Sequence, residues 1–360
     1  MSQKKFNVLI LGCGRVASFH AKAINKNNKL NLEACCDLNQ SRLKEFKKEF
    51  NLQGYNSIDE VFENHKIDIV SICTPSGMHA KHAIYSMKKY NCHVVIEKPM
   101  AMNMREISEL RKISKKKKLT IAPIHQYRFN KCVQRVKRAI INNEMGKPLY
   151  ATVRMRWCRD QLYYKRDIWR GTFSHDGGAT TNQGIHHIDL LRYFFGEPNK
   201  FFSRMFNYNS KFMEVEDTSF SFIEFKKNIM ANVEITTAAR PHDYTSSLSI
   251  MFENGIAEIG GWATDKLNIF SINPAETKKN SENFKSPYGY GHEIIYKSLS
   301  NYLRKIDKNL LVNFEDAAMT INVINGLYES NYNYQWIKLK QTYSRSRLGE
   351  KNESIDKKYL

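Results

Sequence analysis

Long apolar runs are missing from this sequence of 360 residues. The continuous apolar stretches, such as residues 8–11, have the length of a strand and fall far short of the roughly 18 residues that a membrane span needs. The first residues lead directly into that short run, without the longer apolar core and the small-residue cleavage site of a signal peptide. We therefore expect a cytoplasmic protein with no membrane partner.

Cysteine is sparse and poorly spaced for binding a metal. The seven cysteines include no Cys-x-x-Cys pair, and two of them are adjacent at positions 35 and 36. In a chain of this length, scattered cysteines indicate reduced thiols that pack as small apolar groups. We expect no metal site and no disulfide framework.

Acidic residues are too few to balance the lysines and arginines, and the formal net charge is +20. Such a charge occurs in nucleic-acid-binding proteins, but here the lysines are spread over several predicted helices. The sequence contains no helix-turn-helix pattern, zinc finger or aromatic-basic RNA motif. A bias toward lysine and asparagine explains the charge, so we expect no nucleic-acid partner, although the positive field would attract an anionic small molecule.

Short apolar runs alternate with helix-period segments through the first 125 residues. The runs lie at residues 8–11, 32–36, 69–73, 94–96 and 119–122. Helical periodicity is found at residues 17–24, 43–50 and 79–87, and Ser57 to Glu60 has the pattern of a capping box. Continuous apolar strands separated by helices predict an α/β domain with a doubly wound parallel sheet.

Alternation of polar and apolar residues replaces this pattern after about residue 147. It occurs at residues 150–157, 201–208, 218–225, 230–237 and 247–252, and Asn254-Gly255 is typical of a hairpin turn. Helical segments return at residues 292–304 and 315–330. We predict an α+β domain with a large, predominantly antiparallel open sheet. The predicted domains are 1–125, 126–343 and a loosely held polar tail at 344–360.

A Gly-x-Gly-x-x-Ala motif, formed by Gly12, Gly14 and Ala17, follows the first predicted strand and opens a helix. The first glycine permits a tight turn, and the second lets the backbone approach a pyrophosphate. Asp37 ends the second strand, where a carboxylate binds a ribose diol and repels a 2′-phosphate. These features predict NAD as the cofactor, although Arg42 leaves NADP open. The predicted cofactor-binding residues are Gly12, Cys13, Gly14, Arg15, Val16, Asp37, Thr74, Pro75, His79, Glu97, Lys98 and Gln126.

Two further motifs accompany the glycine turn. Glu97-Lys98-Pro99 follows the fourth apolar run, and residues 177–189 are Gly-Gly-Ala-Thr-Thr-Asn-Gln-Gly-Ile-His-His-Ile-Asp. Together with the glycine motif they resemble the Gfo/Idh/MocA oxidoreductases, over roughly residues 5–340. The resemblance implies a Rossmann domain joined to an antiparallel sheet domain.

We predict Lys98, His186 and Asn182 as the catalytic residues. The resemblance implies the first two, which flank the substrate in that family. Many members carry aspartate four residues before the histidine, whereas this chain has Asn182. On one helix, Asn182 and His186 would share a face. A histidine can accept a proton near neutral pH, and a lysine can stabilise a developing oxyanion; which of the two is the base stays open. We expect His187 and Asp189 to be structural.

Asn182-Gln183 resembles the WlbA/WbpB-type subgroup, which oxidises UDP-N-acetylglucosaminuronate at C3 in surface-polysaccharide (lipopolysaccharide) biosynthesis. Residues 154–166 are rich in arginine and aromatic side chains, which suit carboxylate, phosphate and sugar groups. A solvated sheet face is the alternative for that segment. The predicted substrate-binding residues are Arg156, Arg159, Tyr163, Tyr164, Trp169, Arg170, Asn182, Gln183 and His186.

Two other functions remain open at this point. One is an NAD(P)-dependent dehydrogenase of a free sugar or inositol, and the other is a non-catalytic regulator that binds a dinucleotide. The presence of both Lys98 and His186 argues against the regulator. As family members assemble through the open sheet, the resemblance further implies a homo-oligomer, a dimer or a tetramer.

Overall fold

The computed structural model describes residues 5–208 and 213–359. Residues 1–4 of the predicted nucleotide-binding domain, residues 209–212, and Leu360 of the predicted tail lie outside that description. The chain divides into two compact units. Unit 1 comprises residues 1–124, 292–318 and 352–360, and unit 2 comprises residues 125–291 and 319–351. Unit 1 is thus assembled from three separate stretches of the chain.

Unit 1 contains a six-stranded parallel sheet in the order β3-β2-β1-β4-β5-β6. Its strands are β1 (Phe6–Leu11), β2 (Leu30–Cys36), β3 (Gln53–Tyr55), β4 (Ile69–Ile72), β5 (His93–Ile96) and β6 (Ile121–Pro123). The strand order reverses between β1 and β4, and ligands of doubly wound sheets bind at such a point, outside the carboxyl ends of the strands. The five apolar runs are all strands, which confirms that part of the prediction.

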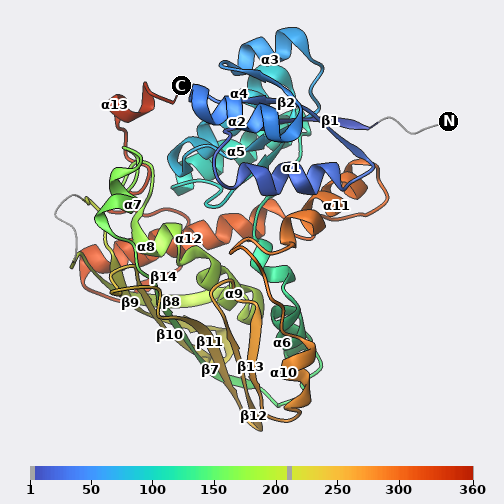
Figure 1. The fold of residues 1–360 in the computed structure, drawn as a ribbon. Coiled ribbons are helices and arrows are strands. Elements are labelled where there is room, and N and C mark those ends of the chain that lie inside the picture. The colour runs from blue at the N-terminus through green and yellow to red at the C-terminus, as the bar shows by residue number, and fades with distance from the viewer. Residues whose placement is uncertain (1–4, 209–212, 360) are drawn as a thin grey trace. The chain divides into compact units, whose positions relative to one another are not determined.

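Helices follow the strands of unit 1 in turn (Figure 1). They are α1 (Ala17–Asn25), α2 (Gln40–Phe50), α3 (Ile58–Asn64), α4 (His79–Tyr90), α5 (Met104–Lys117), α11 (Gly291–Leu303) and α13 (Glu353–Asp356), and α12 (Phe314–Asn333) begins here. Asparagine or serine side chains cap several N-termini; Ser57, for example, accepts a hydrogen bond from the Asp59 N–H at 3.1 Å. Val8, Leu9 and Ile10 are all 0% exposed, as expected for a sheet covered on both faces.

Unit 2 is built on an eight-stranded sheet in the order β13-β12-β11-β7-β10-β9-β8-β14. The strands are β7 (Pro148–Arg156), β8 (Pro198–Phe206), β9 (Thr218–Phe225), β10 (Met230–Thr236), β11 (Thr245–Phe252), β12 (Gly255–Gly260), β13 (Lys266–Phe270) and β14 (Ile337–Lys338). Neighbouring strands are antiparallel except for β7 and β10, which are parallel. Asn254-Gly255 forms the predicted hairpin turn between β11 and β12. The prediction of a large, predominantly antiparallel sheet is confirmed.

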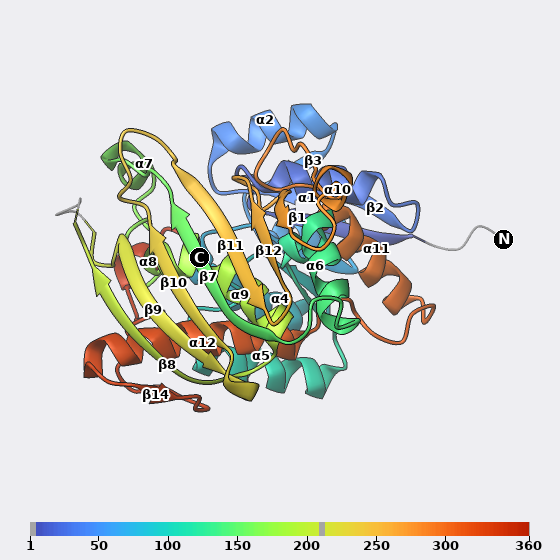
Figure 2. The same cartoon turned by 90° about the horizontal axis from the view of Figure 1, so that it is seen from below.

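One face of the large sheet carries helices, and the other exposes aromatic side chains. The helices of unit 2 are α6 (Lys131–Ile141), α7 (Gln161–Lys165), α8 (Gly178–Asn182), α9 (Ile185–Phe195), α10 (Ala275–Lys279) and the larger part of α12. A Cβ at Gly184 would lie 2.4 Å from Ile235, so the backbone at the start of α9 packs closely against β10. Along β9, Ser219, Ser221 and Ile223 are buried, whereas Phe220 and Phe222 are exposed. Figure 2 shows the strands β7 to β11 side by side.

The C-terminal segment differs from the predicted loosely held tail. Leu348 and Ile355 are buried, and Asp356 forms an ion pair with Lys81 on α4. The backbone oxygen of Tyr359 lies 3.0 Å from the Nε2 atom of His82. Isolated apolar residues in a charged stretch show no periodicity, so the sequence pattern does not indicate that this segment packs against the rest of the chain.

No helix among the described residues combines the length and the apolar character needed to cross a bilayer. The seven cysteines are free thiols, and six of them are buried.

Candidate active site

The glycine turn after β1 has the geometry of a phosphate-binding loop. Gly12 adopts a φ of +91°, and a Cβ on it would lie 2.8 Å from the backbone carbonyl of Cys73. A Cβ on Gly14 would meet nothing within 4 Å, so the space beside this residue is open. Val16 stands at the N-cap of α1 and has no polar side-chain atom to cap the helix. The turn therefore leaves room and helix N–H groups for a dinucleotide pyrophosphate.

Asp37 lies against this turn at the end of β2. Its Oδ2 atom accepts a hydrogen bond from the Cys13 N–H at 2.6 Å, and its Oδ1 atom accepts one from the Asn39 N–H at 2.7 Å. The carboxylate is thus fixed beside the glycine turn, where the sequence placed the ribose-binding acid. This negative charge favours NAD over a 2′-phosphorylated cofactor.

His79 links two of the predicted cofactor-binding turns. Its Nε2 atom lies 2.8 Å from the carbonyl oxygen of Thr74, and its Nδ1 atom lies 2.8 Å from that of Pro99. The ring is 2% exposed, and burial lowers its pKa. His79 therefore ties the loop after β4 to the Glu97-Lys98-Pro99 turn after β5.

Glu97 is the centre of a buried hydrogen-bond network. Its Oε1 atom lies 2.7 Å from Nε2 of His20 and 3.0 Å from Nε2 of His292, and its Oε2 atom accepts from the Lys98 N–H at 3.0 Å. The other side of the His20 ring contacts the hydroxyls of Tyr296 and Ser71, at 2.9 and 3.0 Å. The network fixes the turn that carries Lys98, whose own side chain is partly exposed.

The charge of Glu97 follows from these contacts. Burial alone would raise its pKa, but the hydrogen bonds from His20 and His292 hold the pKa well below its usual range. Burial lowers the pKa of His20 despite its bond to Glu97. The donor atoms of His20, Glu97 and His292 all lie within 4.8 Å of one another, a spacing that could hold a metal ion. Both imidazoles are at hydrogen-bond distance from the same carboxylate oxygen, and a hydrogen-bonded network accounts for this arrangement without an ion.

His186 lies on α9 in unit 2, near its N-terminus. Its ring stacks on that of Tyr127, with centroids 4.2 Å apart and planes inclined by 23°. The side chain is 7% exposed. Tyr127 belongs to η2 (Gln126–Phe129), the short 3₁₀ helix that also carries the predicted cofactor residue Gln126. The stacking sets the plane of the imidazole.

Asn182 ends α8 and does not share one regular helix with His186, because Gln183 and Gly184 separate α8 from α9. Both intervening residues keep right-handed helical dihedrals. The backbone therefore keeps a helical course from Asn182 to His186, although the regular helix that we predicted is interrupted. Asn182 donates a hydrogen bond from Nδ2 to Oδ1 of Asp176. Asp176 is 1% exposed and also accepts from the Gly171 N–H at 2.7 Å.

Glu216 holds the start of α8. Its Oε1 atom accepts from the Thr180 N–H at 2.9 Å, and its Oε2 atom accepts from the Tyr328 hydroxyl at 2.6 Å. Burial raises the pKa of Glu216 to about 7 despite these hydrogen bonds. A Cβ on Gly178 would lie 2.2 Å from this carboxylate, which explains the glycine at that position.

Four of the predicted substrate-binding residues come together in unit 2. The Tyr163 hydroxyl accepts from Nη1 of Arg170 at 2.6 Å and from Nε2 of Gln183 at 3.2 Å. The Arg170 guanidinium also lies over the rings of Tyr163 and Trp169, at 4.4 and 4.5 Å from their centroids. The Asp167 carboxylate accepts a hydrogen bond from Nε of Arg170 at 3.1 Å. We refer to Tyr163, Trp169, Arg170 and Gln183 as the aromatic–arginine cluster.

The remaining predicted substrate residues have other principal partners. Arg156 forms a two-point ion pair with Glu234 on β10, at 2.6 and 2.9 Å, as expected for the alternative of a sheet-face role. The Tyr164 hydroxyl is buried 3.0 Å from that of Thr237, although its ring packs edge-on against Tyr163. Arg159 lies over the ring of Tyr163 at 5.5 Å, at the margin of the aromatic–arginine cluster, and its Nη1 atom donates to Asp243 at 3.1 Å.

His187 and Asp189, which the sequence predicts to be structural, are both buried and bonded within unit 2. Nε2 of His187 lies 3.0 Å from the Ser246 hydroxyl, and burial lowers the pKa of His187 to about 4. Asp189 accepts two hydrogen bonds from Arg128, each at 2.7 Å. Burial would raise the pKa of Asp189, but the Arg128 charge lowers it.

Several residues of the site were not predicted from the sequence. His20, Tyr296 and Ser71 occur in ordinary helix and strand patterns, and only the fold brings them to Glu97. Asp176 and Glu216 carried a weak signal: Asp176 directly precedes the Gly177-Gly178 pair, and Glu216 is an acid next to the buried start of a strand.

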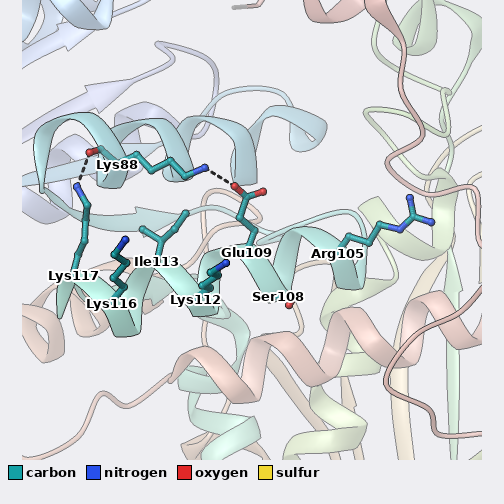
Figure 3. Close-up of a pocket in the computed structure, with 8 residues that line it drawn as sticks. All are labelled: Lys88, Arg105, Ser108, Glu109, Lys112, Ile113, Lys116 and Lys117. Carbon is teal, nitrogen blue, oxygen red and sulfur yellow. Dashed lines mark hydrogen bonds and ion pairs between the residues drawn. The ribbon is translucent and has the colours of Figure 1, made fainter.

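A hollow of about 440 Å³ lies along α5 beside Lys88 of α4, and none of the predicted site residues lines it (Figure 3). It is lined mainly by cations: Lys88, Arg105, Lys112, Lys116 and Lys117. Lys88 donates to Glu109 at 2.6 Å, an exposed pair of the kind that contributes little to stability. This hollow reflects the lysine-rich helix surface seen in the sequence.

Two family models match the chain. Residues 6–125 match the oxidoreductase family model with an NAD-binding Rossmann fold, and residues 133–258 match the GFO/IDH/MocA C-terminal domain. Among curated relatives, glucose-6-phosphate 3-dehydrogenase of Bacillus subtilis is 27% identical over 67% of this chain and 71% of that enzyme. Myo-inositol 2-dehydrogenase of Thermotoga maritima is 26% identical over 52% of this chain, and this match spans only about half, 54%, of that enzyme.

Solved structures extend the likeness to almost the whole chain. The WlbA dehydrogenase from Bordetella pertussis, crystallised with NADH and UDP-GlcNAcA, is 26% identical, with a TM-score of 0.87 over 94% of this chain and 99% of that chain. The WlbA dehydrogenase from Chromobacterium violaceum, in complex with the same two molecules, is 26% identical, with a TM-score of 0.86 over 95% of this chain and 98% of that chain. With its NAD-binding Rossmann fold at residues 6–125, this chain belongs to the Gfo/Idh/MocA family of oxidoreductases.

Proposed function

We propose that this protein oxidises C3 of UDP-N-acetylglucosaminuronate with NAD, giving a 3-keto sugar nucleotide for surface-polysaccharide biosynthesis. The observation that carries the proposal is the likeness, at 26% identity over 94% of the chain, to a dehydrogenase crystallised with NADH and UDP-GlcNAcA. The Asn182-Gln183 pair supports it from the sequence side.

The chemistry requires a hydride acceptor and a group that takes a proton. When bound, NAD accepts the hydride. Lys98 and His186 act on the hydroxyl of the reacting carbon: one removes its proton, and the other donates a hydrogen bond that stabilises the oxygen as it loses that proton. The Glu97 network holds the turn of Lys98, and Tyr127 holds the plane of the His186 ring.

The aromatic–arginine cluster is proposed to bind the charged and planar parts of the substrate. A guanidinium suits a carboxylate or a diphosphate, and aromatic faces suit a sugar or a uracil. Arg170 is already oriented by Tyr163 and Asp167, so little side-chain entropy would be lost when it binds an anion.

An assay with purified protein and NAD tests the proposal by following NADH absorbance. We expect turnover with UDP-N-acetylglucosaminuronate and little with myo-inositol or aldoses. Lys98→Ala and His186→Ala should each lower kcat at least about 100-fold, the size of a lost acid–base contribution, and still bind NADH. Lys112→Ala, at an exposed lysine of α5, is the matched control and should keep full activity.

Retained turnover in both site variants would refute the assigned roles. The pH dependence of kcat then identifies the base: a His186→Gln variant that loses the acidic limb of the profile identifies histidine as the base.

Oxidation of a free sugar, sugar phosphate or cyclitol is the second candidate function. It is favoured by the curated relatives, which are named as dehydrogenases of glucose 6-phosphate and myo-inositol. Turnover of those compounds in the same assay, with none of the UDP-sugar, would select this alternative.

We further propose that the protein is a homo-oligomer associated through the open face of the large sheet. The exposed aromatic side chains Phe220 and Phe222 support this, since contiguous apolar surface on a folded chain marks an interaction site.

A further inference from the structure

Asp176 is a buried carboxylate to which the sequence analysis gave no role. It is 1% exposed, and each of its oxygens accepts a hydrogen bond: Oδ2 from the Gly171 N–H at 2.7 Å, and Oδ1 from Nδ2 of Asn182. Both oxygens therefore act as acceptors, as those of an ionised carboxylate do.

This contact determines the rotation of the Asn182 carboxamide. A carboxylate oxygen accepts and an amide nitrogen donates, so the NH₂ group of Asn182 must face Asp176. The amide oxygen of Asn182 then points away from Asp176. The backbone beneath is held as well, because Glu216 binds the Thr180 N–H and the Tyr328 hydroxyl at the start of α8. Asn182 itself is only partly buried, so its carboxamide can reach a ligand.

We propose that Asp176 is a positioning residue that makes Asn182 a fixed hydrogen-bond acceptor for a hydroxyl or amide N–H of the sugar. This inference rests on the proposed function. The negative charge stays buried on Asp176, and a neutral carbonyl oxygen meets the substrate. An aspartate at position 182 would instead place its charge beside Asp176 and beside the carboxylate of a uronate, where like charges repel.

Reciprocal substitutions test the pair. In Asp176→Asn, the new amide oxygen keeps the hydrogen bond from the Gly171 N–H. The new NH₂ group therefore faces Asn182 and forces the Asn182 carboxamide to rotate. We expect the Kd for UDP-N-acetylglucosaminuronate to rise about tenfold, the loss of one good hydrogen bond. Asn182→Asp alone places two carboxylates together and should lower the Tm. The double variant restores a donor–acceptor pair and with it the Tm.

The double variant also separates positioning from simple structural support. It exposes a charge at position 182, so binding of UDP-N-acetylglucosamine, which lacks the uronate carboxylate, should recover while binding of UDP-N-acetylglucosaminuronate stays weak. A purely structural role predicts that both sugars recover together. Calorimetry gives both Kd values without requiring turnover. Asp68→Asn is the matched control, because Asp68 of unit 1 accepts a hydrogen bond from the Asn7 N–H at 2.8 Å and an asparagine oxygen can keep that bond.

The outcomes distinguish this inference from the proposed function. Recovery of the Tm and of UDP-N-acetylglucosamine binding in the double variant supports the inference, and a double variant no better than the worse single variant overturns it. If the wild-type protein binds neither UDP-sugar, the proposed substrate is refuted. In that case the Tm values alone decide whether residues 176 and 182 form a coupled pair.

Discussion

Glu216 shows how one buried side chain can make the stability of this protein depend on pH. Burial raises its pKa to about 7 from an ordinary value of 4.5, so between these pH values the folded state holds a proton that the unfolded state has lost. The group therefore contributes stability that is complete below about pH 4.5 and is lost as the pH rises through about 7.

Glu216→Gln should remove this pH dependence. We expect the unfolding free energy of the variant, relative to wild type, to rise from pH 4.5 to about 7 by up to about 1.4 kcal/mol per pH unit and then level off. Urea denaturation at several pH values measures the difference. Ser203→Ala, which removes the buried hydrogen bond to Ser221 and no titratable group, is the control and should show no such slope. A flat difference between the Glu216 variant and wild type would mean that this carboxyl group is not held neutral.

Residues that carry chemistry in a local motif were the ones that the sequence could predict. Gly12 and Asp37 are recognisable because a strand, a turn and a second strand place them, and in the structure Asp37 binds the glycine turn through the Cys13 N–H. His20 and Asp176 were not recognised, because each gains its role from a partner that only the fold or a loop brings near.

At the scale of elements, the two glycines in the turn between β1 and α1 differ in whether the fold has room for a side chain. A Cβ at Gly12 would strike the end of β4 and would need a left-handed backbone, whereas a Cβ at Gly14 would point into open space. We expect Gly12→Ala to lower the Tm, because an alanine in this strained backbone conformation costs about 1–3 kcal/mol of unfolding free energy.

Gly14→Ala should leave the Tm unchanged but raise the Kd for NADH, because its methyl group would occupy the space of the pyrophosphate. Thermal melts and NADH fluorescence titrations measure the two effects. Unchanged NADH affinity in Gly14→Ala would show that this turn does not bind the phosphates.

Most elements were predictable because their apolar patterns are long and regular. Strand β3 was missed: Gln53, Gly54 and Tyr55 form no apolar run, and the strand exists only because β2 offers it a partner. The break between α8 and α9 was missed for a related reason, since Gln183 and Gly184 keep helical dihedrals and only Ile235 on β10 crowds the glycine.

At the scale of the whole molecule, the exposed face of the large sheet should determine the association state. Phe220 and Phe222 are 43% and 44% exposed on neighbouring outward positions of β9. We expect Phe220→Glu with Phe222→Glu to reduce the sedimenting mass to that of one chain. Ile141→Glu, at the exposed end of α6, is the control and should leave the mass unchanged. A wild-type protein that sediments as a single chain would refute the oligomer itself.

The network around Glu97 has a consequence for biosynthesis. Its donors come from residues 20 and 292, and unit 1 is completed by residues 292–318 and 352–360. While the ribosome is still translating residues 125–291, the nascent chain has one imidazole for this buried carboxylate and lacks the second. The turn that carries Lys98 therefore reaches its final form only after His292 has been made, and a polypeptide released before that point lacks the finished network.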